Sequence, residues 1–239
     1  MAPPQPASVR NRLLASLPPD VLAQLLPKLS HVVLTMRQGL HAPDEPIEAV
    51  YFPEAGMLSM VTNLDDGVQA EVGIVGPEGM LGASLLSGIE TSFVEAMVQM
   101  PGTAWRMGAR EFRRELDANA PLRTLLLRYN EALHAQVTQT AACNGRHGLE
   151  QRLARWLLMA HDRVEGDELP LTQEFMAMML GVHRPSITVT AGILQRAGLI
   201  RHSGGRITVL DRPSLEAASC ECYGAVRQRF TALLGTPVS

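Results

Sequence analysis

The sequence predicts an α+β protein with an N-terminal antiparallel β-roll, a long helix and a C-terminal winged helix-turn-helix. Three observations predict this order. Short apolar runs separated by Gly, Pro, Asp and Asn fill residues 31–107, which is typical of an antiparallel roll or barrel. Apolar residues then recur at helical spacing over residues 121–143. Finally, residues 171–210 contain two short helical patterns joined by a glycine and followed by a hairpin signal.

Composition places the chain among ordinary globular proteins. It has 239 residues, 46% of them hydrophobic and 19% charged, and a net charge of −3; one large domain or two smaller ones is therefore expected. No apolar run approaches the roughly 20 residues that span a bilayer. The Pro-rich residues 1–7 lack the basic and apolar stretches of a secretory signal. The sequence thus predicts a cytoplasmic protein with no membrane partner.

Two short helices and a set of short strands are expected before residue 108. Pro18 and Pro19 interrupt a leucine-rich stretch over residues 11–29, so two helices form rather than one. The triplet Asp65-Asp66-Gly67 is the strongest hairpin turn, because glycine supplies positive φ there. The apolar runs predicted as strands are 32–34, 49–52, 57–61, 72–75, 94–100 and 103–107.

The long helix, expected from Pro121 to about Cys143, has the spacing of a coiled-coil seam. Its apolar positions step by alternating fours and threes for nearly three heptads, which favours a seam between two subunits. The same spacing fits a helix packed on its own domain's sheet, so that alternative stays open. A further helix is expected over 148–164. The seam positions are Leu122, Leu126, Tyr129, Leu133, Gln136 or Val137, and Thr140.

Residues 171–210 predict a helix-turn-helix followed by a two-stranded wing. Thr172 can cap a first helix over 173–180, and Gly181 provides the positive φ of a tight turn. A second helix begins near Arg184 and ends at Gly198, with strands at 199–202 and 206–209 after it. A helical hairpin with a β-ribbon that binds nothing is the alternative interpretation.

Charge in this segment favours contact with a polyanion. Residues 175–210 contain four arginines and no acidic residue, on a protein that is mildly acidic as a whole. A local basic patch is expected where only one face of a protein meets phosphate. The arginines are Arg184, Arg196, Arg201 and Arg206.

The same segment resembles the DNA-binding domain of the cyclic-AMP receptor protein/fumarate-nitrate regulator (Crp/Fnr) family. The resemblance rests on Leu171-Thr172-Gln173-Glu174, Leu180-Gly181-Val182-His183-Arg184, Ile187, Ile193-Leu194, Leu199-Ile200 and Gly205-Arg206-Ile207, and on the order of elements around them. It implies a bacterial homodimeric transcription regulator that is not an enzyme. The expected parts are a cyclic-nucleotide-binding-like sensor domain (1–120), a dimerisation helix (121–145) and a winged helix-turn-helix domain (146–239). Double-stranded DNA is the expected partner, with RNA polymerase as a further candidate.

Seven residues are candidates for DNA contacts. Arg184 opens the second helix, where the resemblance implies a base-reading arginine, and an Arg fork suits guanine. Pro185 and Val189 stand where much of the family carries a base-reading Glu and Arg. The family's operator sequence is therefore not expected to apply to this protein. Ser186, Thr188 and Val189 are expected on the same exposed face, whereas Thr172, Gln173 and Arg206 are expected at phosphates.

The candidate effector site does not match the family's cyclic-nucleotide pocket. The resemblance implies a Gly-Glu pair on a phosphate-cradling turn and an arginine about ten residues later. Gly76, Glu78 and Gly79 occupy the first region, and Ser92 stands about where the arginine should be. Because a phosphate without a cation is poorly held, cyclic AMP is not the expected effector, and the effector stays unknown.

The three cysteines give little support to a cofactor. No cysteine precedes Cys143, so no iron–sulfur cluster of the family's N-terminal kind is expected, and Cys220-Glu221-Cys222 is tighter than usual metal-site spacing. Packing or surface thiols are favoured there over a metal or redox role. Nucleotide-loop, serine-hydrolase and zinc-protease motifs are missing from the sequence, so no enzyme is expected. A ligand-binding or protein-interaction module with a vestigial winged helix remains the alternative function.

Overall fold

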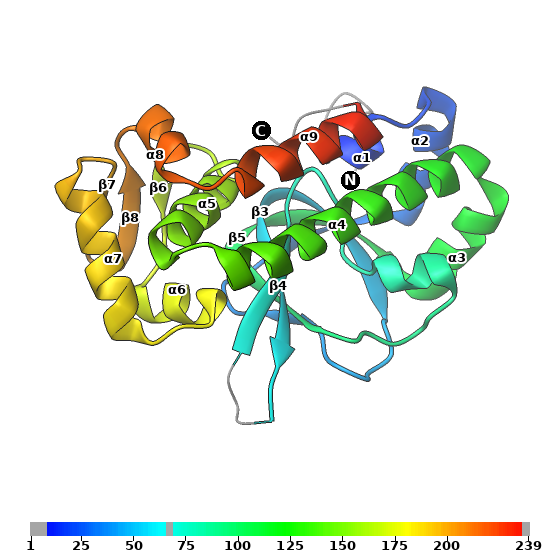
Figure 1. Cartoon of the computed structure of the whole chain (residues 1–239). Helices are drawn as coiled ribbons and strands as arrows, with labels where there is room; N and C mark the ends of the chain where they lie inside the picture. Colours follow the sequence, from blue (N-terminus) through cyan, green and yellow to red (C-terminus); the bar gives the residue numbers. More distant parts are fainter. Residues whose placement is uncertain (1–8, 66–68, 236–239) are drawn as a thin grey trace.

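The computed structural model describes residues 9–65 and 69–235 (Figure 1). The start of the chain and most of the predicted Asp65-Asp66-Gly67 turn lie outside these residues, although the strands on either side of the turn pair as antiparallel neighbours. Among the described residues, no helix is long and apolar enough to cross a membrane.

An antiparallel sheet forms the β-roll, as the sequence predicts. Its strands are β1 (Ser30–Leu34), β2 (Gly39–His41), β3 (Ala49–Asn63), β4 (Gln69–Val75) and β5 (Glu95–Gly108), in the order β1-β5-β3-β4 with β2 also on β5. Helices α1 (Arg12–Ala15), α2 (Pro19–Leu25) and the short 3-10 turns η2 (Leu26–Lys28) and η3 (Ala83–Ser87) surround it. The β-roll here means residues 9–118.

Two pairs of predicted strands are fused into single long strands. The runs at 49–52 and 57–61 both belong to β3, and the last two runs both belong to β5. The register shifts between Pro53 and Leu58, so β-bulges bend the paired strands instead of ending them. Gly102 permits the bend, because a Cβ there would lie 2.0 Å from the Ala55 carbonyl oxygen.

The long helix packs on the β-roll. Helix α3 (Ala109–Ala118) leads into α4 (Ala120–Arg146), which lies along the face of the sheet (Figure 1). Tyr129 Oη donates to the Met80 carbonyl oxygen at 2.9 Å, and the Ile74 amide donates to Gln136 Oε1 at 2.7 Å. Side chains of α4 therefore satisfy backbone groups of the β-roll as well as covering its core.

The predicted seam does not face a second subunit. Its first five positions are buried within this single chain, where they join the apolar core of the β-roll. The correction has a simple physical reason: a stripe with a/d spacing fits any flat apolar surface, and the sheet of the same chain supplies one. The buried positions are Leu122, Leu126, Tyr129, Leu133 and Gln136.

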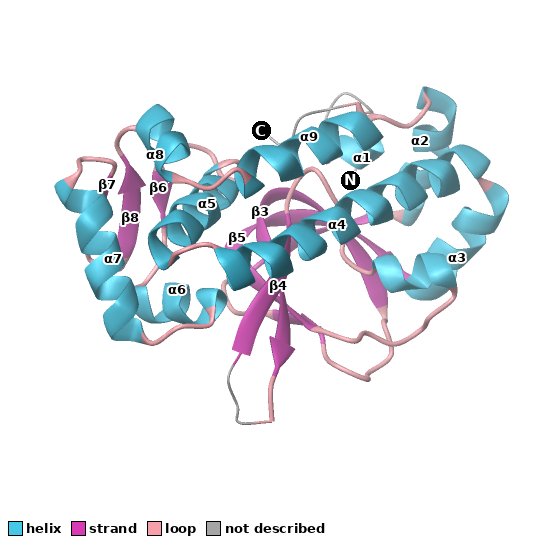
Figure 2. Ribbon diagram, in the orientation of Figure 1, coloured by secondary structure: helices cyan, strands magenta, loops and turns pink. Residues whose placement is uncertain are grey.

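The C-terminal domain (residues 149–218) is a winged helix-turn-helix with one strand more than predicted. Its elements are α5 (Leu149–His161), β6 (Glu168–Leu169), α6 (Gln173–Leu180), α7 (Arg184–Arg196), β7 (Ile200–Ser203), β8 (Arg206–Val209) and α8 (Arg212–Ala218). Strand β6 pairs with β8, so the wing is a three-stranded sheet in the order β6-β8-β7 (Figure 2). Residues 168–169, which the sequence did not predict as a strand, thus supply the third strand of the wing.

The last helix returns to the β-roll. Helix α9 (Cys222–Leu234) lies alongside α4, and Val226 and Phe230 join the same apolar core as Leu126. Figure 1 shows α9 (red) next to α4 (green), far along the sequence but adjacent in space. Helix α9 therefore completes the apolar core beside α4.

We predict that Leu126→Ala lowers the free energy of unfolding by about 2–5 kcal/mol, because it leaves a cavity in the β-roll core. Leu126 is fully buried in the single chain, whereas Leu210 is 51% exposed. Leu210→Ala is the control and should change the free energy of unfolding by less than about 0.5 kcal/mol. Denaturant titrations of both variants make the comparison. Equal effects would place Leu126 outside the core.

Candidate nucleic-acid interface

The turn between α6 and α7 has the local structure that its residues predict. Thr172 Oγ1 accepts a hydrogen bond from the Phe175 amide at 3.2 Å and caps α6. Gly181 ends α6 with φ of +62°, a conformation that side-chain-bearing residues rarely adopt. The Val182 amide then donates back to the Ala177 carbonyl at 3.0 Å. These contacts fix the angle at which α7 leaves α6.

One face of α7 is buried and the opposite face is exposed. Ile187, Ala191 and Leu194 lie in the core of the C-terminal domain, as predicted. Arg184, Ser186, Thr188 and Val189 are all exposed, and the exposed fraction of Val189 reaches 64%. Isolated exposure of a large apolar residue is ordinary, but here it sits among hydroxyls and a guanidinium at the start of the helix. That face has the mixed chemistry that reads base edges.

Thr188 is linked to the first helix and to the wing. Its Oγ1 donates to Gln173 Oε1 at 2.7 Å, and Gln173 Nε2 lies 3.3 Å from His202 Nδ1. The backbone amide of His202 donates in turn to Gln195 Oε1 at 2.7 Å. Two predicted contact residues are therefore neighbours that hold each other, and the network orients them. Sequence reasoning missed His202 and Gln195, since only the fold brings the wing beside α7.

Arg206 lies on the wing, as expected, but it has a partner. Its guanidinium forms an ion pair with Glu168 on the neighbouring strand β6, and both side chains are more than half exposed. Exposed ion pairs contribute little to stability, so a phosphate can compete with this carboxylate. Thr172 lies close to the wing: a Cβ on Gly205 would be 3.3 Å from its Cγ2. The predicted phosphate contacts thus come together at one edge of the C-terminal domain.

The C-terminal domain docks on the β-roll through a buried polar cluster. Trp156 Nε1, on α5, donates to Glu71 Oε1 on β4 at 2.7 Å. Ser59 Oγ lies 2.5 Å from Glu71 Oε2 and 2.6 Å from Gln99 Oε1. Burial raises the pKa of Glu71 to about 7, although its hydrogen bonds to Ser59 and Trp156 oppose the shift.

Known proteins share both halves of this architecture. The family model of the cyclic nucleotide-binding domain matches residues 33–119, and that of the Crp-like helix-turn-helix domain matches residues 151–218. The chain belongs to the Crp/Fnr family of transcription regulators. It therefore has the fold of DNA-binding regulators and not of enzymes. A search of curated proteins gave no match.

Solved Crp/Fnr structures match most of the chain at low sequence identity. A protein described as a transcriptional regulator of the crp/fnr family, from Eubacterium rectale, is 21% identical, with a TM-score of 0.68 over 86% of this chain and 96% of that one. FixK2 from Bradyrhizobium japonicum is 16% identical, with a TM-score of 0.68 over 80% and 98%. The c-di-GMP responsive regulator CLP from Xanthomonas campestris is 17% identical, with a TM-score of 0.64 over 80% and 99%. At these identities, the matches support the fold.

The four predicted effector residues of this Crp/Fnr protein do not form one site. Glu78 is buried, and Arg163 Nη2, from the connector after α5, lies 2.6 Å from Glu78 Oε1. Gly79 packs under Tyr129, where a Cβ would lie 2.5 Å from the phenol oxygen. The turn at 76–79 therefore binds the chain's own arginine and tyrosine. The sequence prediction rested on the Gly and Glu residues of this turn and did not foresee an arginine from 85 positions later in the chain.

Ser92 lies at a different place, beside a small cavity in the β-roll. Its Oγ donates to the Val94 carbonyl at 2.7 Å, and the cavity next to it measures about 50 Å³. Pockets that hold drug-sized molecules are typically about 300–1,000 Å³. In this conformation the β-roll interior is therefore filled by its own side chains, including Met60, Met80 and Leu133.

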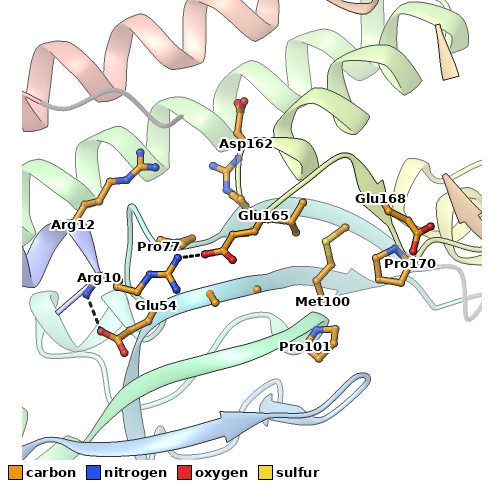
Figure 3. A pocket seen from close by; sticks show the side chains of 14 residues that line it. Arg10, Arg12, Glu54, Pro77, Met100, Pro101, Asp162, Glu165, Glu168 and Pro170 are labelled. Carbon is orange, nitrogen blue, oxygen red and sulfur yellow. Dashed lines mark hydrogen bonds and ion pairs between the residues drawn. The ribbon is translucent and has the colours of Figure 1, made fainter. Parts of the chain in front are cut away.

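A larger cleft of about 430 Å³ separates the β-roll from the connector at residues 162–170. Figure 3 shows Arg10 reaching across it to Glu165, while the Arg10 amide donates to Glu54 Oε1 at 2.8 Å. Both walls carry both signs of charge, with Arg10 and Glu54 on the β-roll side and Arg163 and Glu165 on the connector side. Two ion pairs, Arg10–Glu165 and Arg163–Glu78, thus join the connector to the β-roll.

Glu71→Gln should remove a pH dependence of stability. The folded-state pKa of Glu71, about 7, lies above the ordinary glutamate value of 4.5. The protonated form therefore favours folding, and this contribution is complete below pH 4.5 and lost as pH rises through 7. We expect the wild type to lose up to about 3 kcal/mol relative to Glu71→Gln between pH 4.5 and 8.

Denaturant titrations across that pH range measure the difference. Glu174→Gln, which removes an exposed carboxylate from α6, controls for the loss of one negative charge. Parallel stability curves for the wild type and Glu71→Gln would show that Glu71 is not the titrating group.

Proposed function

We propose that this protein is a dimeric, sequence-specific DNA-binding transcription regulator of Crp/Fnr type. The observation that carries the proposal is the exposed, acid-free face of α7, held by a capped α6 and flanked by the wing. Arg184 would read a base edge, with Ser186, Thr188 and Val189 on the same face. Thr172, Gln173 and Arg206 would position the domain on phosphates.

Dimerisation is assigned to the outer face of α4. A second stripe on this helix steps by alternating threes and fours, and every member is exposed. Its spacing is that of a coiled-coil seam, and Leu127 supplies its largest apolar side chain, 46% exposed. Two-fold pairing along this stripe would set two α7 helices on successive major grooves of double-stranded DNA. The stripe comprises Thr124, Leu127, Glu131, His134, Thr138, Ala141 and Gly145.

The β-roll would act on DNA binding through its contact with the C-terminal domain. Glu71–Trp156 and Glu78–Arg163 both cross this contact. An effector that binds the β-roll would favour one arrangement of the two domains, which is a population shift. Cyclic AMP is not the effector we propose, because the 76–79 turn is occupied by Arg163 and the cavity beside Ser92 is small.

Selection of genomic fragments with purified, ligand-free protein at two salt concentrations tests the proposal. Recovery of a two-fold symmetric sequence, with half-sites about one helical turn apart, supports a dimeric reader that needs no effector. Recovery of random fragments, bound in a salt-sensitive way, would restrict the protein to non-specific binding in this state. A failure to retain DNA at either salt concentration would favour a ligand-binding or interaction module with a vestigial winged helix.

Arg184→Ala should cost about 1–3 kcal/mol of discrimination at one base pair per half-site. The measurement is a comparison of affinities for the selected site and for the site changed at each position. Arg196→Ala, an exposed arginine in the last turn of α7, is the control for charge removal and should leave discrimination intact. Equal weakening on specific and random DNA would make Arg184 a phosphate contact.

Leu127→Glu should convert the protein to a monomer. In a two-fold dimer along this seven-residue stripe, the substitution would bring two negative charges, one from each subunit, into the subunit contact. Its effect is measured by light scattering at micromolar concentration. Leu210→Glu, on an exposed leucine far from α4, is the matched control. An unchanged dimer would move the subunit contact away from this stripe.

A further inference from the structure

Three cysteines and a histidine meet at one point of the fold. Cys143 and His147 stand four residues apart at the end of α4, and Cys220 and Cys222 flank Glu221 at the start of α9. Their ligand atoms all lie within 4.8 Å of one another. All three sulfurs are buried, and His147 is largely so. These are the only cysteines of the chain, and the fold collects them from positions 77 residues apart.

The distances fit four ligands of one metal ion. A tetrahedral Zn²⁺ with Zn–S of about 2.3 Å and Zn–N of about 2.0 Å places its sulfurs about 3.8 Å apart and sulfur and nitrogen about 3.6 Å apart. Cys143 Sγ and Cys220 Sγ are separated by 3.5 Å, and Cys222 Sγ and His147 Nδ1 also by 3.5 Å. Both pairs thus stand near the edge lengths of such a tetrahedron, and far outside the length of a disulfide bond.

Neighbouring side chains orient two of the four residues, His147 and Cys222. His147 turns Nδ1 toward the sulfurs, and its Nε2 lies 3.3 Å from Glu221 Oε1. A carboxylate on the second ring nitrogen is the usual partner of a metal-binding histidine. Gln139 Nε2 donates to Cys222 Sγ at 3.0 Å.

Charge balance points the same way. Three thiolates and one Zn²⁺ sum to −1, and the buried Arg155 guanidinium interacts electrostatically with Cys143. Arg152, on the same face of α5, interacts with Cys143 as well. A thiolate-rich ion is therefore placed beside compensating positive charge.

We propose that Cys143, His147, Cys220 and Cys222 form a structural Zn²⁺ site that fastens the start of α9 to the end of α4. A closed Cys₃His set with no open position is typical of structural zinc and not of catalytic zinc. The site lies at the junction of α4 and α5, where only residues 147–148 separate the two helices. Zinc there fixes the last turn of α4, from which the C-terminal domain departs. The binding of zinc does not rest on the DNA-binding proposal; only its consequence for DNA does.

Metal content and Co²⁺ spectroscopy of the full-length protein test the site. We expect about one zinc per chain after purification without added metal or chelator. Protein stripped by a chelator under reducing conditions should bind one equivalent of Co²⁺, with thiolate charge-transfer bands and the intense visible bands of a tetrahedral ion. Zn²⁺ should abolish these bands and raise the thermal unfolding temperature.

Variants assign the ligands. Cys220→Ser and His147→Ala should lose or strongly shift the Co²⁺ bands, and Glu221→Gln should weaken Zn²⁺ binding by roughly 10–100-fold. His31→Ala, which removes an exposed histidine of β1, is the matched control and should bind as the wild type does. Circular dichroism of each stripped protein separates loss of ligand from loss of fold, and Glu221→Gln keeps all four ligands in place.

Some results would overturn the proposal. These are octahedral Co²⁺ spectra, binding that ignores all three variants, or a Cys143–Cys220 disulfide in protein purified under reducing conditions. If Zn²⁺ binds as expected but its removal leaves DNA affinity unchanged, the metal site stands and its effect on DNA does not. If Zn²⁺ binds and no DNA is retained at all, the DNA-binding proposal fails alone.

Discussion

Two buried carboxylates at the edge of the β-roll, Glu71 and Glu78, hold the C-terminal domain in its place against the β-roll. A charged carboxylate removed from water costs several kcal/mol unless a partner compensates it. Glu78 finds its partner in Arg163, which belongs to the connector of the other domain. Glu71 receives the indole N–H of Trp156 from α5. Each of the two carboxylates of the β-roll is thus compensated by a residue that comes from beyond α4.

The two faces of α4 have different chemistry and different contacts. Its inner face fills the β-roll core and supplies Tyr129 and Gln136 to backbone groups of the sheet. Its outer face keeps a second heptad stripe, with polar and small residues around Leu127. A 27-residue helix is long enough to do both, since each face needs only every third or fourth residue. A change in the sheet would thereby reach the proposed subunit contact through one rigid element.

The sequence predicted best those features that depend on residues close together in the chain. Thr172, Gly181 and the inward Ile187 lie within 16 consecutive residues, so their spacing was enough to define the helix-turn-helix. The β-roll was predicted as a class, but the fusion of runs into β3 and β5 depends on bulges that only pairing reveals. Contacts between residues far apart in the sequence could not be predicted from it. Glu78 meets Arg163 from 85 positions away, and a heptad stripe does not say whether its partner is a sheet or a second helix.

The short link between the helices determines how such contacts act. Only two residues join α4 to α5, so the C-terminal domain stays within reach of the β-roll even when it undocks. Docking of the C-terminal domain on the β-roll would then be an intramolecular equilibrium at high effective concentration. Each polar contact between the two domains would favour the docked state by its own free energy. The loss of one proton from Glu71, or of one ion pair, would then change this population without unfolding either domain. A cluster of ligands at the end of α4 lies where the direction of that link is set, so anything that stiffens this turn limits the orientations from which α7 can approach DNA.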